Sequence, residues 1–392
     1  MMITASLRRG IAAAVLLPSL ASLPARGEQP RLEVTEVFVG GTDDINTYRI
    51  PSLICTRDGT VLAFCEGRKN SYRDGSPTHL VLKRSLGNAG PWIPRKPEGP
   101  AFSRSREQNM TWQPIQILIA STAGEAYMNP VPVIDRSSGS IHLLVNRHRN
   151  YDPSGSDAQV FLLTSSDEGA TWTRPVDLTP ATEAKELGPG IGIQMKSGRL
   201  VVPTYDGVIY SEDHGRTWKA GGKAPGPVDE SQVVELADGS LMRNARSSPQ
   251  RMIMISPDGG TTWGEARRDP ALTDSELWGG CQASLVRYSR AGDGHTRNRL
   301  LFANPADLKY RQNLTVRMSY DEGQTWPLAK AITPGGAAYS SLTVFPDGSV
   351  GLIFETGNIY GDPTEYYAQL AFARFNLTWL TDGKDQGIGR SQ

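Results

Sequence analysis

An octapeptide of the form S-x-D-x-G-x-T-W occurs four times, and this repeat constrains the fold more than any other feature of the sequence. The intact copies begin at Ser165, Ser211, Ser256 and Ser319. A fifth copy, Ser85–Trp92, is degraded, with glycine in place of the aspartate and alanine in place of the glycine. Serine and aspartate side chains hydrogen-bond nearby backbone amides, glycine supplies a positive φ, and tryptophan anchors the turn in apolar surroundings. Each copy therefore predicts the turn of a β-hairpin.

Short β-like runs surround these turns. Two such runs, Val160–Leu163 and Met252–Ile255, come directly before a box. Others follow Asp-Gly or Ser-Gly turn pairs, at Thr60–Phe64, Leu200–Pro203 and Leu241–Asn244. Long helical periodicity is nearly absent, and the 41 glycines and 27 prolines supply many turns. We therefore expect an all-β fold.

The repeat also predicts how the strands are grouped. Many short strands in units of roughly 45 to 80 residues are typical of a β-propeller with four-stranded antiparallel blades. Residues 31–392 provide roughly 60 residues for each of six blades. We expect a six-bladed β-propeller and favour it over seven blades or a β-sandwich.

The first residues of the chain have the features of an export signal. Arg8 and Arg9 form a positive region, Ile11–Leu23 is mostly apolar, and Ala25–Gly27 offers small residues for cleavage. The arginine pair is compatible with twin-arginine export, but the surrounding residues do not complete that motif. We expect a signal peptide over 1–27, a single folded domain over 28–392, and a protein that is secreted or periplasmic.

Composition excludes several classes of function. Lys plus Arg is 41 and Asp plus Glu is 41, so the net charge is zero. A nucleic-acid or anionic-membrane surface needs a basic excess, which this chain lacks. Three scattered cysteines and five histidines without metal-ligand spacing argue against a metal site. We expect no cofactor, no essential disulfide, no membrane span and a monomer, while a few arginines in one pocket remain compatible with an anionic small molecule.

The octapeptide resembles the Asp-box of the bacterial neuraminidase repeat (BNR). That repeat occurs in sialidases, but also in sortilin-type receptors, plant photosystem factors and other glycan-binding propellers. The box therefore indicates a fold and leaves the function open.

The segments between the boxes resemble the exo-α-sialidase (neuraminidase) family. Thr47–Ser52 looks like the family's Arg-Ile-Pro motif, and Cys65–Arg68, followed six residues later by Asp74, resembles its second characteristic stretch. Further matches follow in order along almost the whole mature chain, at Asp229–Gln232, Arg246, Arg311–Thr315 and Ala338–Leu342. No single motif is as specific as this ordered set.

The resemblance implies a site for a sugar acid. A sialic acid carries a carboxylate on its anomeric carbon, and arginine binds carboxylates in a bidentate way while staying charged. The family uses three arginines, and Arg49, Arg246 and Arg311 match them.

The resemblance also implies the reacting groups. A carboxylate nucleophile would meet the substrate's own negative charge, and sialidases use a tyrosine where most glycosidases use two carboxylates. Tyr339 matches this nucleophile and Glu230 the adjacent base that a phenol with a pKa of about 10 requires. Asp74 matches the general acid/base that protonates the leaving oxygen and then activates water. Two steps at the anomeric carbon predict retention of configuration.

Four further positions have supporting roles by resemblance. Arg68 matches an arginine near the C4 hydroxyl, and Glu355 matches a glutamate that orients the first arginine. We expect Gln282 to touch the glycerol tail and Asn129 to lie in a loop near the pocket, although a plain turn explains Asn129 equally well. The segment 93–128 matches nothing firmly.

The sequence thus predicts a retaining exo-α-sialidase that acts on sialylated glycans, glycoproteins or glycolipids. A non-catalytic sialoglycan-binding propeller is the alternative from another class. A trans-sialidase, an intramolecular trans-sialidase or a hydrolase of a related nonulosonic acid would keep the same residues and change the substrate or product.

Overall fold

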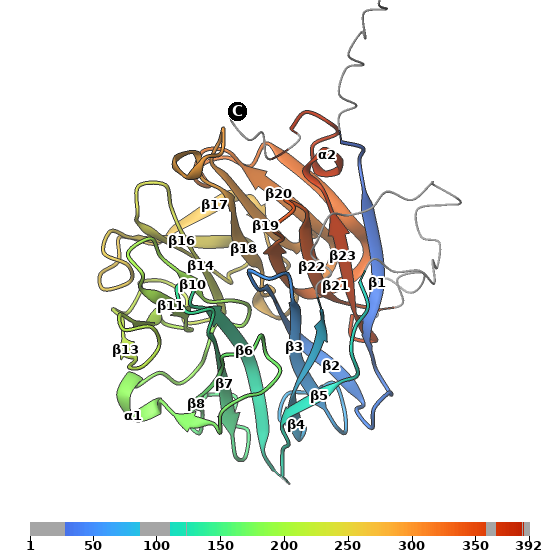
Figure 1. The fold of residues 1–392 in the computed structure, drawn as a ribbon, viewed down its shortest axis with the longest axis vertical. Helices are drawn as coiled ribbons and strands as arrows, with labels where there is room; N and C mark the ends of the chain where they lie inside the picture. Colours follow the sequence, from blue (N-terminus) through green and yellow to red (C-terminus); the bar gives the residue numbers. More distant parts are fainter. Residues whose placement is uncertain (1–27, 87–109, 123, 358–365, 386, 388–392) are drawn as a thin grey trace, which may run out of the picture.

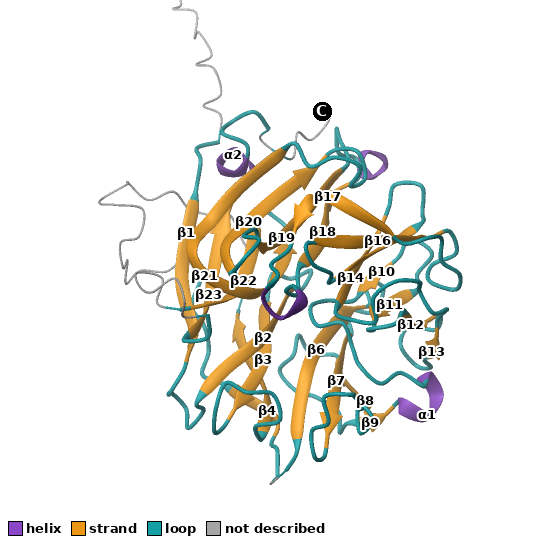
Figure 2. Cartoon of the chain, turned by 180° about the vertical axis from the view of Figure 1, so that it is seen from behind, coloured by secondary structure: helices purple, strands orange, loops and turns teal. Residues whose placement is uncertain are grey.

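The computed structural model describes residues 28–86, 110–122, 124–357, 366–385 and 387, and these residues form an all-β fold, as predicted. The sheets follow one another in chain order around the middle of the molecule, from blue through green and yellow to red (Figure 1). Figure 2 shows the same arrangement from behind, with few helices between the strands. The helical segments are α1 (Thr179–Thr182), α2 (Leu377–Leu380), η1 (Leu277–Gly279) and η2 (Ala291–Asp293). Among the described residues, no helix is long and apolar enough to cross a membrane.

Two separate sheets each contain four antiparallel strands in chain order, which confirms the predicted four-stranded antiparallel units. The first consists of β10 (Ile193–Gln194), β11 (Leu200–Pro203), β12 (Val208–Ser211) and β13 (Lys219–Ala220). The second consists of β14 (Ser231–Glu235), β15 (Leu241–Ala245), β16 (Gln250–Ser256) and β17 (Arg267–Thr273).

A third sheet joins two such groups. One group is β2 (Thr47–Cys55), β3 (Val61–Arg68), β4 (Thr78–Ser85) and β5 (Gln116–Ile119). The other is β6 (Ala126–Ile134), β7 (Ile141–His148), β8 (Gln159–Ser165) and β9 (Val176–Asp177). The two groups are linked through a single parallel pairing between Thr78 and Ala126, whereas every other pairing in the sheet is antiparallel.

The fourth sheet contains the long strand β21 (Leu328–Val344), which belongs to two groups at once. Its first half pairs with β20 (Gln312–Ser319), which continues to β19 (Arg299–Pro305) and β18 (Ser284–Ser289). From Ala337 onward it pairs with β22 (Val350–Thr356), followed by β23 (Gln369–Phe375). Strand β1 (Leu32–Val39) pairs antiparallel with β23, so the first and the last of the described strands share one sheet.

The four intact octapeptides form the turns that the sequence predicts, each after the third strand of its group. In the first box, Ser165 Oγ donates to Asp167 Oδ1 at 2.8 Å, and Gly169 N donates to Ser165 Oγ at 2.9 Å. Thr171 donates through both its backbone N–H and its hydroxyl to the Asp167 carboxylate. The same bonds recur in the other three boxes. Gly169 has a φ of 75°, and the box tryptophans pack beneath the turns, with Trp218 and Trp326 buried.

The predicted strands are found with small shifts at their ends. The predicted strand Leu200–Pro203 coincides with β11, and the predicted strand Leu241–Asn244 lies within β15. The strand predicted over Thr60–Phe64 was too short, because β3 continues to Arg68. Most of the degraded fifth box and the predicted signal segment 1–27 lie outside the described residues. The three cysteines carry free thiols.

Candidate active site

The structure brings most of the predicted site residues together from seven different parts of the chain. All but Asp74 lie in the first strand of a group or next to a strand end, so the fold gathers segments that are far apart in sequence. The positions are Arg49 in β2, Asp74 in the loop after β3, Glu230 just before β14, Arg246 just after β15, Arg311 just before β20, Tyr339 in β21 and Glu355 in β22.

Tyr339 and Glu230 form the centre of this cluster. The Tyr339 hydroxyl donates a short hydrogen bond to Glu230 Oε1. Arg246 Nη1 donates to Glu230 Oε2 at 2.8 Å and to the Tyr339 oxygen at 3.2 Å. One guanidinium group therefore bridges the carboxylate and the phenol, and a proton leaving the phenol has an acceptor already in contact.

The surroundings keep the phenol protonated when the site is at rest. Burial raises the pKa of Tyr339 well above its ordinary value, and the negative charge of Glu230 raises it further. The positive charges of Arg246 and Arg311 act in the opposite direction without cancelling these effects. The Tyr339 oxygen can become a nucleophile at neutral pH only if a base takes its proton, and Glu230 is in position to do so.

Arg49 is fixed by Glu355, as the sequence predicts for that pair. Arg49 Nε donates to Glu355 Oε1 at 3.0 Å and Nη2 donates to Oε2 at 3.3 Å. The same carboxylate accepts the backbone N–H groups of Ile50 at 2.8 Å and Tyr339 at 3.2 Å. Glu355 is fully buried, so it ties β2 to β21 and sets the orientation of the Arg49 guanidinium.

Arg311 lies on the other side of the phenol. Its Nη2 donates to the Gly280 carbonyl at 2.8 Å and its Nη1 donates to the Tyr367 hydroxyl at 3.3 Å. The guanidinium carbon lies 4.8 Å from the centre of the Trp278 ring and 5.5 Å from that of Tyr339. Three guanidinium groups thus surround one phenol, and those of Arg49 and Arg311 belong to buried residues.

Asp74 is held by an ion-pair chain. Arg68 Nη2 lies 2.8 Å from Asp74 Oδ1 and 2.6 Å from Glu66 Oε2. Arg68 and Glu66 are fully buried, and Glu66 also accepts the backbone N–H of Asn129 at 2.9 Å. The side chain of Asp74 is 50% exposed, in the polar loop that the sequence predicts. Asp74 is therefore an accessible carboxylate on a rigid support.

These groups face a pocket that also has a second wall. The catalytic side is lined by Ile50, Arg68, Asp74, Glu230 and Tyr339. The second wall comes from β6, the end of β7 and the loops that follow, and its lining residues are Met128, Asn129, His148, Tyr151, Glu186 and Tyr205. Asn129 lies at the pocket as predicted, but it belongs to β6, where the pairing with β7 is irregular between Met128 and Val131, and the predicted loop was wrong.

Gln282 differs from the prediction. Its side chain is almost completely buried, and its carboxamide donates to the carbonyls of Pro189 and Ser340 and accepts the N–H of Ser340 at 2.9 Å. All of its polar atoms are engaged with backbone, so this residue joins the irregular segment at Pro189 to β21 and does not line the pocket.

Several residues around the site were not singled out from the sequence. Glu66 lies in a segment that was recognised, and its alternation with Arg68 along β3 was the available signal. Tyr367, Tyr205 and Glu186 lie in irregular segments without a repeat or motif, so only the fold places them near Tyr339. No group of three or more His, Cys, Asp or Glu side chains in the described part of the chain is arranged to hold a metal ion.

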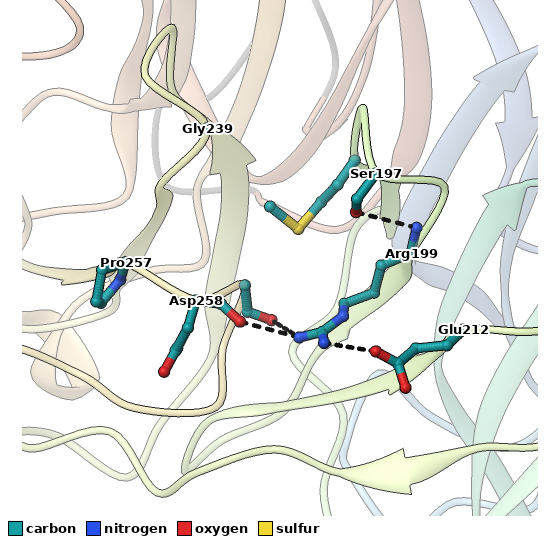
Figure 3. A pocket seen from close by; sticks show the side chains of 8 residues that line it. Ser197, Arg199, Glu212, Gly239, Pro257 and Asp258 are labelled. Atoms are coloured by element: carbon teal, nitrogen blue, oxygen red, sulfur yellow. Dashed lines mark hydrogen bonds and ion pairs between the residues drawn. The ribbon is translucent and has the colours of Figure 1, made fainter.

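A larger hollow lies elsewhere, beside the second and third boxes. Figure 3 shows it, with Arg199 in contact with Glu212 and with the backbone near Asp258. Arg199 Nη1 also donates to the Gly259 carbonyl at 3.1 Å. The one cation of the hollow is thus bound by the protein itself, and the hollow offers no reacting pair like Tyr339 and Glu230.

The chain is similar to known proteins in sequence and in fold. A family model described as a BNR repeat-like domain matches residues 101–352. The sialidase of Micromonospora viridifaciens is 32% identical over 393 residues, covering 92% of this chain and 56% of that protein, so the chain spans about half the length of this relative.

Two solved structures have the same fold. The Hadza microbial sialidase Hz136 has a TM-score of 0.73 at 25% identity, covering 88% of this chain and 69% of that chain. An intramolecular trans-sialidase from Ruminococcus gnavus has a TM-score of 0.69 at 20% identity, covering 88% of this chain and 98% of that chain. The second likeness concerns the fold alone.

Proposed function

Because the chain belongs to the sialidase family with BNR repeats, whose members are glycoside hydrolases, we propose that it is a retaining exo-α-sialidase. It releases terminal α-linked sialic acids from glycans, glycoproteins or glycolipids. The observation that carries this proposal is the hydrogen bond from the Tyr339 hydroxyl to Glu230 among three guanidinium groups. A glycan-binding module without catalysis has no use for a phenol paired with a base.

The arginines around Tyr339 favour an anion. Glu355 and Glu230 are in direct contact with Arg49 and Arg246, and Asp74 and Asp229 lie 3.9 and 3.8 Å from the same two guanidinium groups. Arg311 contacts the Gly280 carbonyl and the Tyr367 hydroxyl and none of these carboxylates, so a substrate carboxylate would supply its charge partner. Because Glu355 already orients Arg49, binding the carboxylate requires little rearrangement there, which favours tight positioning of the anomeric carbon.

Bond cleavage then follows from the positions of the three reacting groups. The Tyr339 oxygen attacks the anomeric carbon while Glu230 takes the phenolic proton. Asp74 gives its proton to the glycosidic oxygen, which leaves as an alcohol with the bonding electron pair. The sugar is then bound covalently to the Tyr339 oxygen, and the released glycan can diffuse away.

The second half of the reaction, in which water releases the sugar from Tyr339, reverses the proton transfers of the first half. Asp74, now a carboxylate, removes a proton from water, and the water oxygen attacks the anomeric carbon. The bond to Tyr339 breaks, and Glu230 returns the proton to the phenolate. Two displacements at one carbon restore the original configuration, so the sugar is released as the α-anomer.

The proposal also covers the number of blades, the extent of the catalytic domain and the role of the N-terminal segment. The two isolated sheets, with the two groups in each of the larger sheets, support a six-bladed propeller in which β1 completes the sheet of β23. Residues 28–392 then form one catalytic domain. Residues 1–27 direct export to the periplasm or outside the cell, and this part rests on the sequence alone.

One experiment tests the activity and its product. The purified protein is incubated with sialyllactose, and the released species is identified by NMR over time. We expect the α-anomer of free sialic acid to appear first and then mutarotate. Release of the β-anomer first would exclude retention, an anhydro sugar would indicate intramolecular transfer, and binding without release would exclude the hydrolase.

A further inference from the structure

The second wall of the pocket has polar chemistry that the proposed reaction does not use. Glu186 is its central residue, in the irregular segment between α1 and β10. Glu186 Oε1 lies 3.3 Å from His148 Nε2, and Asn129 Nδ2 donates to Glu186 Oε2 at 3.5 Å. Two side chains from neighbouring strands thus hold one carboxylate at the pocket surface.

His148 connects Glu186 to a second carboxylate. His148 Nδ1 lies 3.1 Å from Asp157 Oδ1, and the imidazole is almost fully buried. Burial lowers the pKa of His148, but hydrogen bonds and charges from Glu186 and Asp157 outweigh burial, so the net shift is upward. A protonated imidazole between two carboxylates still leaves the group with a net negative charge. Asp157 also accepts the backbone N–H groups of Arg149, Asn150 and Asp152, so this support is rigid.

The second wall can be matched to the edge of the sugar ring that lies opposite C2. If Tyr339 meets C2 of a pyranose ring and the arginines hold its carboxylate, the edge opposite C2 must face away from them. In that ring, C5 lies across from C2. The remaining wall of the pocket is the one formed by Asn129, His148 and Glu186.

The chemistry of the wall favours a small hydrogen-bond donor at that edge. A hydroxyl group donates directly to the Glu186 carboxylate, and hydrogen bonds to charged groups are the stronger ones. An acetamido group can donate its N–H as well, but it is bulkier than a hydroxyl group, and any part of its acetyl group that lies against the Glu186 carboxylate deprives polar atoms of hydrogen-bond partners. Apolar surface on this wall comes from Met128 and from the rings of Tyr151 and Tyr205, whereas Glu186 with its partners His148 and Asn129 is polar.

We propose that Glu186, positioned by His148 and Asn129, forms a subsite for a substrate hydroxyl group, so that the enzyme prefers nonulosonic acids with a 5-hydroxyl over those with a 5-acetamido group. This inference rests on the proposed function and specifies its substrate. Glu186 determines specificity and takes no part in breaking the glycosidic bond.

The test compares two substrates that differ at this one position. Methylumbelliferyl α-glycosides of the 5-hydroxy and 5-acetamido acids are hydrolysed by the parent protein and by Glu186→Ala and Glu186→Gln. We expect kcat/KM of the parent to favour the 5-hydroxy substrate by about tenfold or more, as for one hydrogen bond to a charged group. The ratio should fall in both variants, most in Glu186→Ala, which removes the carboxylate and makes room for the acetyl group.

The Glu186→Gln variant keeps the size of the side chain, so a change in its substrate ratio cannot be ascribed to a loss of folding. Glu183→Gln is the matched control, because Glu183 is an exposed carboxylate three residues away. The control should keep the parental ratio. A parent that favours the 5-acetamido substrate, with the same ratio in the Glu186 variants, would overturn the inference and leave the sialidase proposal intact. Cleavage of neither substrate would overturn both.

Discussion

The Tyr339 hydroxyl donates a hydrogen bond to Glu230 although 109 positions separate the two residues in the chain. Tyr339 lies within β21 and Glu230 directly precedes β14, so two different sheets must be in place before the pair exists. The reactive pair is thus a product of the tertiary fold, and it provides the most direct test of the proposed mechanism.

Replacing the phenol should abolish most turnover and leave the fold intact. Tyr339→Phe removes one oxygen and keeps the ring that packs with Ile50, Cys281 and Ala338. We expect kcat with sialyllactose to fall by at least about 10²-fold, because no other oxygen occupies the nucleophile's place. Thermal unfolding should change little. A variant with near-parental kcat would exclude Tyr339 as the nucleophile.

Removing the proposed acid should have an effect that depends on the leaving group. Asp74→Ala loses the proton donor, which is typically worth about 10² to 10⁴-fold in rate. An aryl leaving group departs without a proton, so the loss should be much smaller with a methylumbelliferyl substrate than with sialyllactose. Equal losses on both substrates would contradict a role in protonating the glycosidic oxygen. Asp44→Ala, an exposed loop aspartate, serves as the control.

Releasing Arg49 from its partner should weaken substrate binding. Glu355→Gln keeps the shape of the side chain but removes the charge that orients the Arg49 guanidinium. We expect KM to rise and kcat/KM to fall by about tenfold or more, as for loss of one charge-assisted hydrogen bond. Steady-state kinetics measure this, with circular dichroism to verify folding, because Glu355 also accepts two backbone N–H groups.

The box carboxylates should make stability depend on acid pH. Hydrogen bonds from Thr171 and Ser165 lower the pKa of Asp167 to about 2, from 3.8 in an unperturbed group. A lowered folded-state pKa adds stability that is complete above pH 3.8 and is lost as the pH falls toward 2. Asp167→Ala should therefore lower the unfolding free energy at pH 7, and the difference from the parent should shrink near pH 2. Denaturant titrations at both pH values measure this.

Replacing the box glycine Gly169 by alanine should lower the free energy of unfolding by more than the positive φ alone would cause. Gly169 has a φ of 75°, and a Cβ there would clash with Leu62 Cδ2. Gly139 has a φ of 77° with open space around it, so Gly139→Ala measures the conformational cost by itself, about 1 to 2 kcal/mol. Gly169→Ala should exceed that by about 1 to 3 kcal/mol from overpacking. Equal losses in unfolding free energy would contradict the clash.

The box turns could be predicted from the sequence because the interactions that form them are local. The Ser165–Asp167–Gly169 bonds lie within one octapeptide, so the sequence contains the whole interaction. The end of β3 was missed because its last residues, up to Arg68, are strand only through pairing with β2 and β4.

The sequence could predict several residues that the structure brings together at the candidate site, but not the contacts that hold them. Arg49, Asp74, Glu230 and Tyr339 belong to recognisable motifs, whereas Gln282 was assigned to the pocket although its amide is bound by backbone from two other segments. Such partners are set by the packing of distant strands, which no local pattern records. Glu186 escaped notice for the same reason, since its neighbours Asn129 and His148 lie far away in sequence.

The pairing of β1 with β23 has a consequence for the order of folding. During synthesis β1 leaves the ribosome long before β23, so β1 has no partner while all the strands between them are being made. An unpaired strand edge is a template for wrong associations. The sheet that contains β1 can therefore be completed only after β23 has been made, and a protein truncated before β23 should aggregate instead of folding partway.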